Sequence, residues 1–336
     1  MNYQRFYNNK EHDHSAVSEI IETCLPAVNQ KITTAFVSDS KVISDISHYL
    51  FNLGGKKLRP VMLLLTTRLF GMKTPSEKII AACAAIELVH MATLLHDDII
   101  DRSPTRRGKD SVYKKFGADA SLLAGDFLLV RAFGLSSSTL DEKIVAYTEK
   151  ACIALTEGEQ LEGTITGNNH RSLQEYFTII SKKTAALFAL SCAAGAYLAD
   201  ADEEQIKIME NFGEIIGMVF QIIDDILDIT SEKTHFGKPV GTDLKQKTPS
   251  IVNVLWLESG DKKAKEFFNL AAPTADDISS AIQYLRTSPF VAEAKKIAEE
   301  FADKAKAELG KLAGAVDAQV MQHFIKLIDK TLTRCV

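Results

Sequence analysis

Residues 77–100 read EKIIAACAAIELVHMATLLHDDII, a stretch in which apolar residues recur at steps of three and four and also spread around the predicted helix. This pattern is typical of a helix surrounded by other helices. Only 8 prolines and 18 glycines interrupt the 336 residues, and the segments between them are rich in Ala, Leu, Ile, Glu and Lys, which favour helix. No alternating run exceeds a few residues, and no Asn-Gly hairpin signal occurs. The sequence therefore predicts an all-α fold.

Acidic residues interrupt the apolar end of this stretch. The pattern Asp-Asp-x-x-Asp occurs there and again further along the chain: Asp97, Asp98, Asp101, Asp224, Asp225 and Asp228. At 3.6 residues per turn, the first and last aspartates of each motif lie within roughly 40° of each other, one turn apart. Two carboxylates ~4 Å apart repel by about 4 kcal/mol at an effective dielectric constant of ~20. Each motif therefore implies raised pKa values or bound cations.

Magnesium is the cation that fits such motifs. It prefers oxygen ligands, keeps several waters and is usually held by one or two carboxylates together with substrate phosphates. A single motif would as readily cap a helix or face solvent. Two copies, each flanked by isoleucine and leucine, favour acids that line a cavity and bind a metal diphosphate.

Lysines and arginines gather in the predicted breaks between helices. They lie in GGKKLRP (54–60), SPTRRGK (103–109), KKT (182–184) and GKPVGTDL (237–244). Arginine binds phosphate with two parallel hydrogen bonds, whereas lysine acts as a point charge. Each cluster alone is more simply a solvated loop, and GGKKLRP lacks P-loop spacing. Together with the six aspartates, they predict a site for two diphosphates.

Composition excludes several other classes of protein. The net charge of -5 argues against nucleic acid as a partner. The five cysteines are scattered and never form a C-x-x-C pair, so we interpret them as core thiols in a reducing compartment. Residues 1–15 are polar where a signal peptide would be apolar. We therefore expect a cytoplasmic protein whose first 15 residues are mobile.

Two apolar stretches, 79–95 and 184–199, raise the question of a membrane span. Both are shorter than the ~20 residues that cross a bilayer, so we expect helices buried within the protein and no transmembrane segment. The segment from Val291, VAEAKKIAEEFADKAKAELGKLAGA, has a polar face and should lie outside. No break is long enough to be a domain linker, so we predict one all-helical domain over residues 1–336.

From about Leu53 to about Ser250 the chain resembles the trans-isoprenyl diphosphate synthases, or polyprenyl synthetases, of the long-chain type. The resemblance is carried by these motifs in this order: GGKKLRP, HMATLLHDDIIDRSPTRRGK, GDF at 125–127, KKTA at 182–185, FQIIDDILD and GKPVGTDL. It implies an isoprenoid-synthase-type antiparallel helical bundle around a deep central cavity. The two aspartate motifs would face each other at the cavity mouth.

The same resemblance implies roles for individual residues. The six aspartates would hold Mg²⁺, three ions with substrate bound, that bridge to an allylic diphosphate. Contacts to that diphosphate would come from Arg106, Lys183, Thr184, Gln221 and Lys238, the first two acting in catalysis with the aspartates. Isopentenyl diphosphate would be bound by Lys56, Arg59, His90 and Arg107.

Other polar residues near the motifs have simpler interpretations. Without the resemblance, His90 would be a hydrogen-bonded core histidine, and Glu87 is expected to make a structural hydrogen bond. Cys83 and Cys152 are expected in the core.

One stretch departs from the family pattern. Many relatives place Gly-Lys-x-Thr shortly after an Asp-Leu pair, whereas this chain reads KQKTPS after Asp243-Leu244. Lys247 is therefore displaced by one position, and Thr248 occupies the usual place of the lysine. The sequence leaves open whether Lys247 reaches the phosphates.

The reaction implied is ionisation of the allylic diphosphate, condensation and proton loss, which makes an all-trans polyprenyl diphosphate. Ala92 and Thr93 lie about 6 to 7.5 Å below Asp97 on the same helix, and Val89 continues this wall. Their small size, without an aromatic plug, predicts a product of six or more isoprene units. Phe127, Phe133 or a neighbouring helix are alternative floors for the growing chain.

Four alternatives remain open at this point. They are a shorter-chain (farnesyl or geranylgeranyl) diphosphate synthase, a class I terpene cyclase, a non-catalytic partner subunit of a heteromeric synthase, and a helical scaffold. The second Asp-Asp-x-x-Asp motif and GGKKLRP argue against the cyclase, and the intact aspartates argue against the partner subunit. The resemblance also implies a homodimer and leaves open that the product is handed to a membrane.

Overall fold

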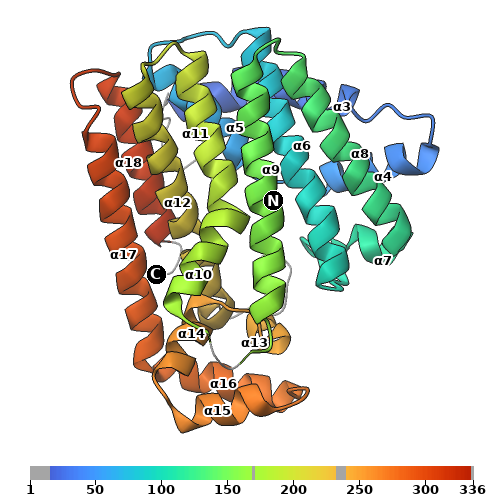
Figure 1. Cartoon of the computed structure of the whole chain (residues 1–336), viewed down its shortest axis with the longest axis vertical. Helices are drawn as coiled ribbons and strands as arrows, with labels where there is room; N and C mark the ends of the chain where they lie inside the picture. The colour runs from blue at the N-terminus through green and yellow to red at the C-terminus, as the bar shows by residue number, and fades with distance from the viewer. Residues whose placement is uncertain (1–15, 169–170, 232–239, 334–336) are drawn as a thin grey trace.

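The structure is a computed structural model that describes residues 16–168, 171–231 and 240–333. The predicted mobile segment 1–15 and the predicted phosphate ligand Lys238 lie outside the described residues. Figure 1 shows the long helices lying side by side along the long axis of the molecule, with two shorter helices, α15 and α16, crossing one end. The buried apolar side chains form one continuous core that extends from Ile20 to Ile328.

The elements of the first half of the chain follow in order. They are α2 (Ala16–Glu19), the π-helical turn η1 (Ile20–Cys24), α3 (Leu25–Thr34), α4 (Lys41–Asn52), α5 (Leu58–Leu69), α6 (Glu77–Ile100), β1 (Thr105–Arg106), β2 (Lys109–Asp110), α7 (Val112–Phe116), α8 (Ala118–Ser137) and α9 (Glu142–Ile165). Within the described ranges, strand structure is limited to β1 and β2, which pair antiparallel. The predicted all-α fold is confirmed.

The second half is helical throughout its described part. It contains α10 (Leu173–Ile180), the π-helical turn η2 (Ser181–Ala185), α11 (Ala186–Leu198), α12 (Glu203–Thr230), α13 (Thr242–Gln246), α14 (Ile251–Glu258), α15 (Lys262–Asn269), α16 (Ala275–Thr287), α17 (Pro289–Gly310) and α18 (Ala318–Leu332). Capping boxes begin α10 at Ser172, α12 at Asp202 and α16 at Thr274. These caps satisfy backbone N–H groups that the first turn of a helix leaves unpaired.

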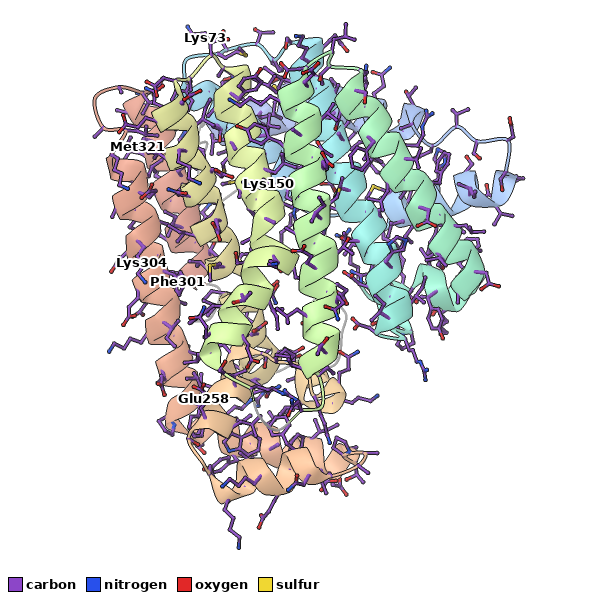
Figure 2. The ribbon with its side chains drawn as sticks, viewed as in Figure 1. Lys73, Lys150, Glu258, Phe301, Lys304 and Met321 are labelled. Carbon is purple, nitrogen blue, oxygen red and sulfur yellow. The ribbon has the colours of Figure 1, made fainter. Side chains whose placement is uncertain are left out.

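Packing of the long helices follows from their apolar faces. Every residue of α6 from Ile79 to Val89 is buried, as expected for a helix surrounded by others, and α6 packs most extensively on α8. α12 packs on α11 and α17. On α17, Ala294, Ala298 and Ala302 face inward, whereas Lys304 is exposed beside Phe301 (Figure 2). The predicted outer polar face of this helix is confirmed.

Among the described residues, three helices are long and apolar enough to cross a membrane by length and composition alone: Glu77–Ile100, Ala118–Ser137 and the continuous Leu173–Leu198, with 24, 20 and 26 residues. The expectation that the apolar stretches are too short is wrong, because the helices extend beyond them. In Glu77–Ile100, 78% of the most apolar window is buried inside the protein, against 33% in Ala118–Ser137. Burial accounts for the composition of α6, whereas α8 keeps an exposed apolar face.

Phe212 of α12 is fully buried and packs edge-on against Phe324 of α18, with ring centroids 5.3 Å apart. Phe212→Ala should lower the free energy of unfolding by about 3–5 kcal/mol, because it removes a buried ring and leaves a cavity. Chemical denaturation measures the effect. Lys304→Ala on the exposed face of α17 is the control and should stay within about 0.5 kcal/mol of the starting protein. A loss below about 1 kcal/mol for Phe212→Ala would contradict this packing.

Candidate active site

A cavity of about 1140 Å³ opens among α5, α6, α8, α9, α10, η2, α11, α12 and α13. This volume slightly exceeds the ~300–1,000 Å³ typical of small-molecule sites. Both aspartate motifs contribute to its lining, as do the basic segments GGKKLRP, the β1–β2 turn and η2. The structure therefore brings together segments that lie more than one hundred residues apart in the chain.

The three aspartates of the first motif occupy two different environments. Asp97 and Asp101 line the cavity. Asp98 is fully buried and does not line it; its carboxylate accepts hydrogen bonds from Nε and Nη2 of Arg106, each at 2.8 Å. Such a bidentate pair is strong and directional. Asp98 is therefore placed to orient Arg106, and not to hold metal as predicted.

The second motif lines the cavity with all three of its aspartates. Oδ2 of Asp225 accepts hydrogen bonds from the hydroxyl of Tyr176 at 2.8 Å and from the backbone N–H of Ile251 at 3.0 Å. Asp228 accepts the backbone N–H groups of Thr242 at 3.2 Å and Asp243 at 3.0 Å, at the beginning of α13. These bonds tie the end of α12 to α10, α13 and α14.

Burial changes the acidity of two of these carboxyls. It raises the pKa of Asp97 from 3.8 to about 7, against the opposing effect of Lys183. It also raises the pKa of Asp225 to about 7, although hydrogen bonds from Gln221 and Tyr176 act in the other direction. Acids in this state bind protons near neutrality unless a cation is supplied. The sequence predicted such raised pKa values, because the aspartates lie in apolar helices.

The set of donors suits a divalent metal shared with a substrate. Within the described ranges, no group of three or more His, Cys, Asp or Glu side chains is close enough to hold an ion by itself. Asp97 and Asp101 from α6 and Asp224 from α12 nevertheless offer carboxylate oxygens to one cavity. Magnesium is commonly held by one or two carboxylates with substrate phosphates completing the shell. The residues present fit a metal diphosphate better than a closed protein cage.

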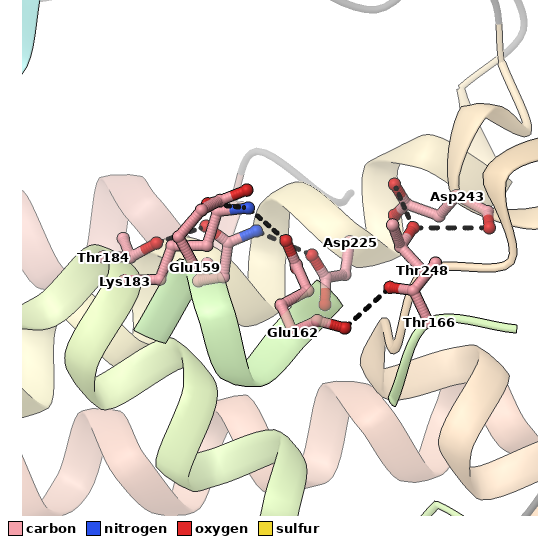
Figure 3. A network of polar contacts seen from close by, with 9 residues as sticks. Glu159, Glu162, Thr166, Lys183, Thr184, Asp225, Asp243 and Thr248 are labelled. Atoms are coloured by element: carbon pink, nitrogen blue, oxygen red, sulfur yellow. Dashed lines mark hydrogen bonds and ion pairs between the residues drawn. The ribbon is translucent and has the colours of Figure 1, made fainter. Parts of the chain in front are cut away.

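Lys183 lies in η2, and π-helical turns of this kind often occur at functional sites. Its Nζ lies 2.7 Å from Oε2 of Glu159 and also pairs with Glu162 (Figure 3). Gly158 permits this approach, since a Cβ there would meet the backbone nitrogen of Lys183 at 2.6 Å. An incoming diphosphate must therefore share Lys183 with these two glutamates.

Glu159 and Glu162 were not predicted as site residues, although both line the cavity. Burial raises the pKa of Glu162, and Lys183 opposes the rise. Burial by itself would lower the pKa of Lys183, but Glu162 and the other nearby carboxylates raise it. The only sequence signal was the spacing of two glutamates within GEQLE, which places them on one helical face.

A hydrogen-bonded chain joins two other predicted residues to the second motif. The hydroxyl of Thr184 donates to Oε1 of Gln221 at 2.8 Å, and Nε2 of Gln221 donates to Oδ1 of Asp225 at 2.8 Å. This chain fixes the orientation of the Gln221 amide. The structure thus places Thr184, Gln221 and Asp225 on one wall.

The predicted isopentenyl diphosphate ligands form a basic wall: Lys56, Arg59, His90 and Arg107 all line the cavity. The guanidinium of Arg107 lies over Gly55, where a Cβ would come within 2.9 Å of Nη1. Burial lowers the pKa of Arg59 to about 10. Burial, then Arg59 and Arg107, hold the pKa of His90 well below its usual range. His90 is therefore neutral and can accept as well as donate a hydrogen bond.

The structure answers the question that the sequence left open about Lys247. Its Nζ donates to the backbone oxygens of Phe268, at 3.0 Å, and Leu270. Lys247 therefore binds the end of α15 and does not line the cavity, whereas Thr248 does. Gln246, which was not predicted, lines the cavity and donates to the backbone oxygen of Asp101 at 3.3 Å.

Apolar side chains line the deeper part of the cavity. They are Val89 and Leu94 of α6, Leu129 of α8 and Leu155 of α9, together with Thr93 and the half-buried Cys152. Of the predicted wall residues, Val89 and Thr93 are therefore confirmed as lining. Ala92 is fully buried and lies outside the lining, because it faces neighbouring helices.

Three further side chains differ from their predicted places. Phe127 and Phe133, considered as floors, do not line the cavity, whereas Phe188 does. Cys152 was expected in the core and instead lines the cavity. On α6 the lining extends from Asp97 back to Glu87, ten residues or about 15 Å along the helix.

Comparison with known proteins identifies similar sequences and folds. A family model described as polyprenyl synthetase matches residues 40–285. A short chain isoprenyl diphosphate synthase of Methanocaldococcus jannaschii is 34% identical over 272 residues, covering 79% of this chain and 82% of the relative. A nonaprenyl diphosphate synthase of Mycobacterium tuberculosis is 33% identical over 310 residues, covering 91% of each.

A solved structure extends the similarity to the fold. The polyprenyl synthase from Caulobacter crescentus, crystallised with calcium and isoprenyl diphosphate, superposes with a TM-score of 0.87 at 30% identity. The match covers 97% of this chain and 100% of that one.

The raised pKa of Asp97 leads to a pH dependence. We expect Mg²⁺ with inorganic pyrophosphate to raise Tm more at pH 8 than at pH 6, because metal binding must remove the proton that Asp97 holds below about pH 7. Without metal, the same shift makes the free energy of unfolding fall as pH rises from about 4 to about 7, since the folded state binds the proton more tightly.

Differential scanning fluorimetry measures both effects. Asp97→Asn should abolish the shift caused by metal and pyrophosphate at both pH values. Asp119→Asn, at an exposed position in the first turn of α8, is the matched control. An unchanged, pH-dependent shift in Asp97→Asn would rule out this carboxylate as a metal ligand.

Proposed function

The chain belongs to the polyprenyl synthetase family, and from that premise we propose that it condenses isopentenyl diphosphate with an allylic diphosphate in a Mg²⁺-dependent reaction. Prenyl transfer is the family activity. The observation that carries the proposal is one cavity lined both by acidic side chains of the two aspartate motifs and by basic side chains of GGKKLRP and the β1–β2 turn. The basic wall would bind the second diphosphate, which a terpene cyclase does not need.

Each wall has a distinct role in the proposed reaction. Asp97, Asp101 and Asp224 would hold Mg²⁺, three ions when substrate is bound; the metal supplies Lewis-acid charge that stabilises the departing diphosphate. Arg106, oriented by Asp98, and Lys183 would add positive charge at the same diphosphate. These groups are preorganised, so little reorganisation accompanies ionisation.

The chemistry then proceeds between the two substrates. The C1–O bond of the allylic diphosphate breaks, and the alkene of isopentenyl diphosphate forms the new carbon–carbon bond at C1. A proton leaves C2 of the former isopentenyl unit and passes to the released diphosphate. Lys56, Arg59 and Arg107 would hold the isopentenyl diphosphate in line, and the apolar lining keeps water from the carbocation.

We further propose a product of six or more isoprene units. The small and medium side chains of Val89, Thr93 and Cys152 support it, because none blocks the cavity with a ring. A shorter product is the rival, since the lining on α6 ends about 15 Å below Asp97. The relatives named above include both short-chain and nonaprenyl enzymes. The aspartates of both motifs line the cavity or, in the case of Asp98, orient Arg106. A non-catalytic partner subunit has no need of these aspartates, so this alternative is disfavoured.

We propose that two copies of the chain form a homodimer through α8 and α9. Leu122, Leu123 and Val130 of α8 and Ile153 of α9 are exposed large apolar side chains. Exposed apolar patches of this kind commonly mark protein interfaces. In the dimer, each copy would cover these apolar side chains of the other copy.

The decisive experiment is incubation with isopentenyl diphosphate, farnesyl diphosphate and Mg²⁺, with products separated by chromatography. Asp97→Asn and Asp224→Asn should each lower kcat/KM at least about 10²-fold, because each removes charge that binds the metal diphosphate. Asp119→Asn should leave the rate unchanged. Condensation undiminished in both motif variants would refute the proposed mechanism.

Product length should respond to the deep lining. Thr93→Tyr and Cys152→Phe should shorten the product by at least one isoprene unit while isopentenyl incorporation continues, with the greater shortening for Thr93→Tyr, which lies nearer the metals. Ala307→Phe, on the exposed face of α17, is the control. Ala92→Tyr should instead lower Tm, because Ala92 is packed between helices. Unchanged product length in both lining variants would exclude this wall as the ruler.

Mass in solution tests the dimer. Val130→Glu combined with Ile153→Lys should convert a particle of twice 37.0 kDa to one of 37.0 kDa in light scattering, because charge is placed in the buried interface. Lys304→Ala on α17 should leave the mass unchanged. A starting protein that is already monomeric would refute the proposal.

A further inference from the structure

One ion pair beside the cavity has no role in the reaction described above. Nζ of Lys57 lies 3.0 Å from Oε1 of Glu87, and both side chains are only 7% exposed. Lys57 precedes α5, whereas Glu87 lies in the middle of α6. The pair therefore joins the glycine-led loop to the helix that carries the first aspartate motif. Because both charges are withdrawn from water, each depends on the other.

Lys57 lines the cavity, and its ammonium is held by two neighbouring side chains. Its ammonium lies 4.4 Å from the ring centroid of Phe51, on α4, in addition to its contact with Glu87. Its φ of 50° is in the left-handed region, which is unfavourable for a residue with a Cβ. Glu87 and Phe51 fix the position of the Lys57 ammonium.

Glu87 also has a special place among the acids that line the cavity. It lies one turn before His90 on α6, beside the basic wall, whereas the aspartate motifs lie at the C-terminal ends of α6 and α12. Its charge raises the pKa of both Arg59 and Arg107, opposing the effect of burial on each. Like charges gathered in a buried wall repel one another. A carboxylate at this position stabilises the cluster before any diphosphate has bound.

We propose that Lys57 and Glu87 form a positioning pair that holds the loop of residues 54–57 in the conformation that binds the second diphosphate. The pair acts through Lys56, Arg59 and Arg107 and contacts no reacting atom. This inference rests on the proposed function, because the diphosphate concerned is that of isopentenyl diphosphate. The allylic diphosphate lies at the other walls and depends on Arg106 and Lys183.

The test is Glu87→Gln, which keeps the shape of the side chain and removes its charge. The KM for isopentenyl diphosphate should rise at least about tenfold, whereas kcat and the KM for the allylic diphosphate stay within about threefold. Binding of isopentenyl diphosphate in EDTA, measured by calorimetry, should weaken by a similar factor. Lys57→Arg, which preserves the pair, should retain an isopentenyl KM close to that of the starting protein.

A second variant separates positioning from folding. Lys57→Met combined with Glu87→Met leaves no unpaired buried charge, so its Tm should be close to that of the starting protein. We expect its KM for isopentenyl diphosphate to remain raised. If Tm and this KM are both restored, the pair only contributes to stability and the inference is wrong. This variant also decides the matter if Glu87→Gln fails to fold.

Glu19→Gln is the matched control, since Glu19 pairs with Arg68 at 2.8 Å away from the cavity, and it should alter neither KM. Equal rises of both KM values in Glu87→Gln would also overturn the inference. If the unaltered protein makes no prenyl product, the proposed function itself fails. Condensation by the unaltered protein without a selective effect of Glu87→Gln would refute only the positioning pair.

Discussion

The cost of burying carboxylates in one apolar cavity is the constraint on which this structure depends. Asp97 lies on α6, Asp101 directly follows that helix, and Asp224 lies on α12, all among isoleucine and leucine residues. Burial raises the pKa of Asp97 to about 7. Without metal, this carboxyl therefore holds a proton below about pH 7 in place of the negative charge that would bind a cation. A divalent cation bound with diphosphate would offset the same cost. The acidic half of the site is thus organised for a ligand that brings its own positive charge.

The neighbouring polar groups reduce this cost without removing it. Asp98 is neutralised by Arg106, and Asp225 and Asp228 accept hydrogen bonds from the elements that follow α12. Lys183 pairs with Glu159 and Glu162. Among the basic residues of the cavity, Glu87 performs the corresponding function for cations. Both halves of the cavity therefore carry internal counter-charges that keep the walls in place before substrates arrive.

Much of the architecture could be predicted from sequence because it depends on local periodicity. The spread of apolar residues around 77–100 predicted a buried helix, and α6 is one. The alternation of polar and apolar faces from Val291 likewise predicted the outer helix α17. The sequence also predicted that aspartates of the two motifs line the cavity, because a charge among apolar residues is costly unless it binds a partner or ligand. Glu159 and Glu162 were missed because an exposed helix with the same spacing would look identical.

By itself the sequence determined the fold class, the two acidic motifs and the candidate basic residues, since helical period and residue chemistry are encoded within a few turns. Only the tertiary structure decided which members of those sets meet. Asp98 orients Arg106 and not a metal, Lys247 binds the end of α15, and Ala92 faces a neighbouring helix while Cys152 faces the cavity. The physical reason is that these contacts join residues from separate helices. Their distances depend on how those helices pack, which no local pattern specifies.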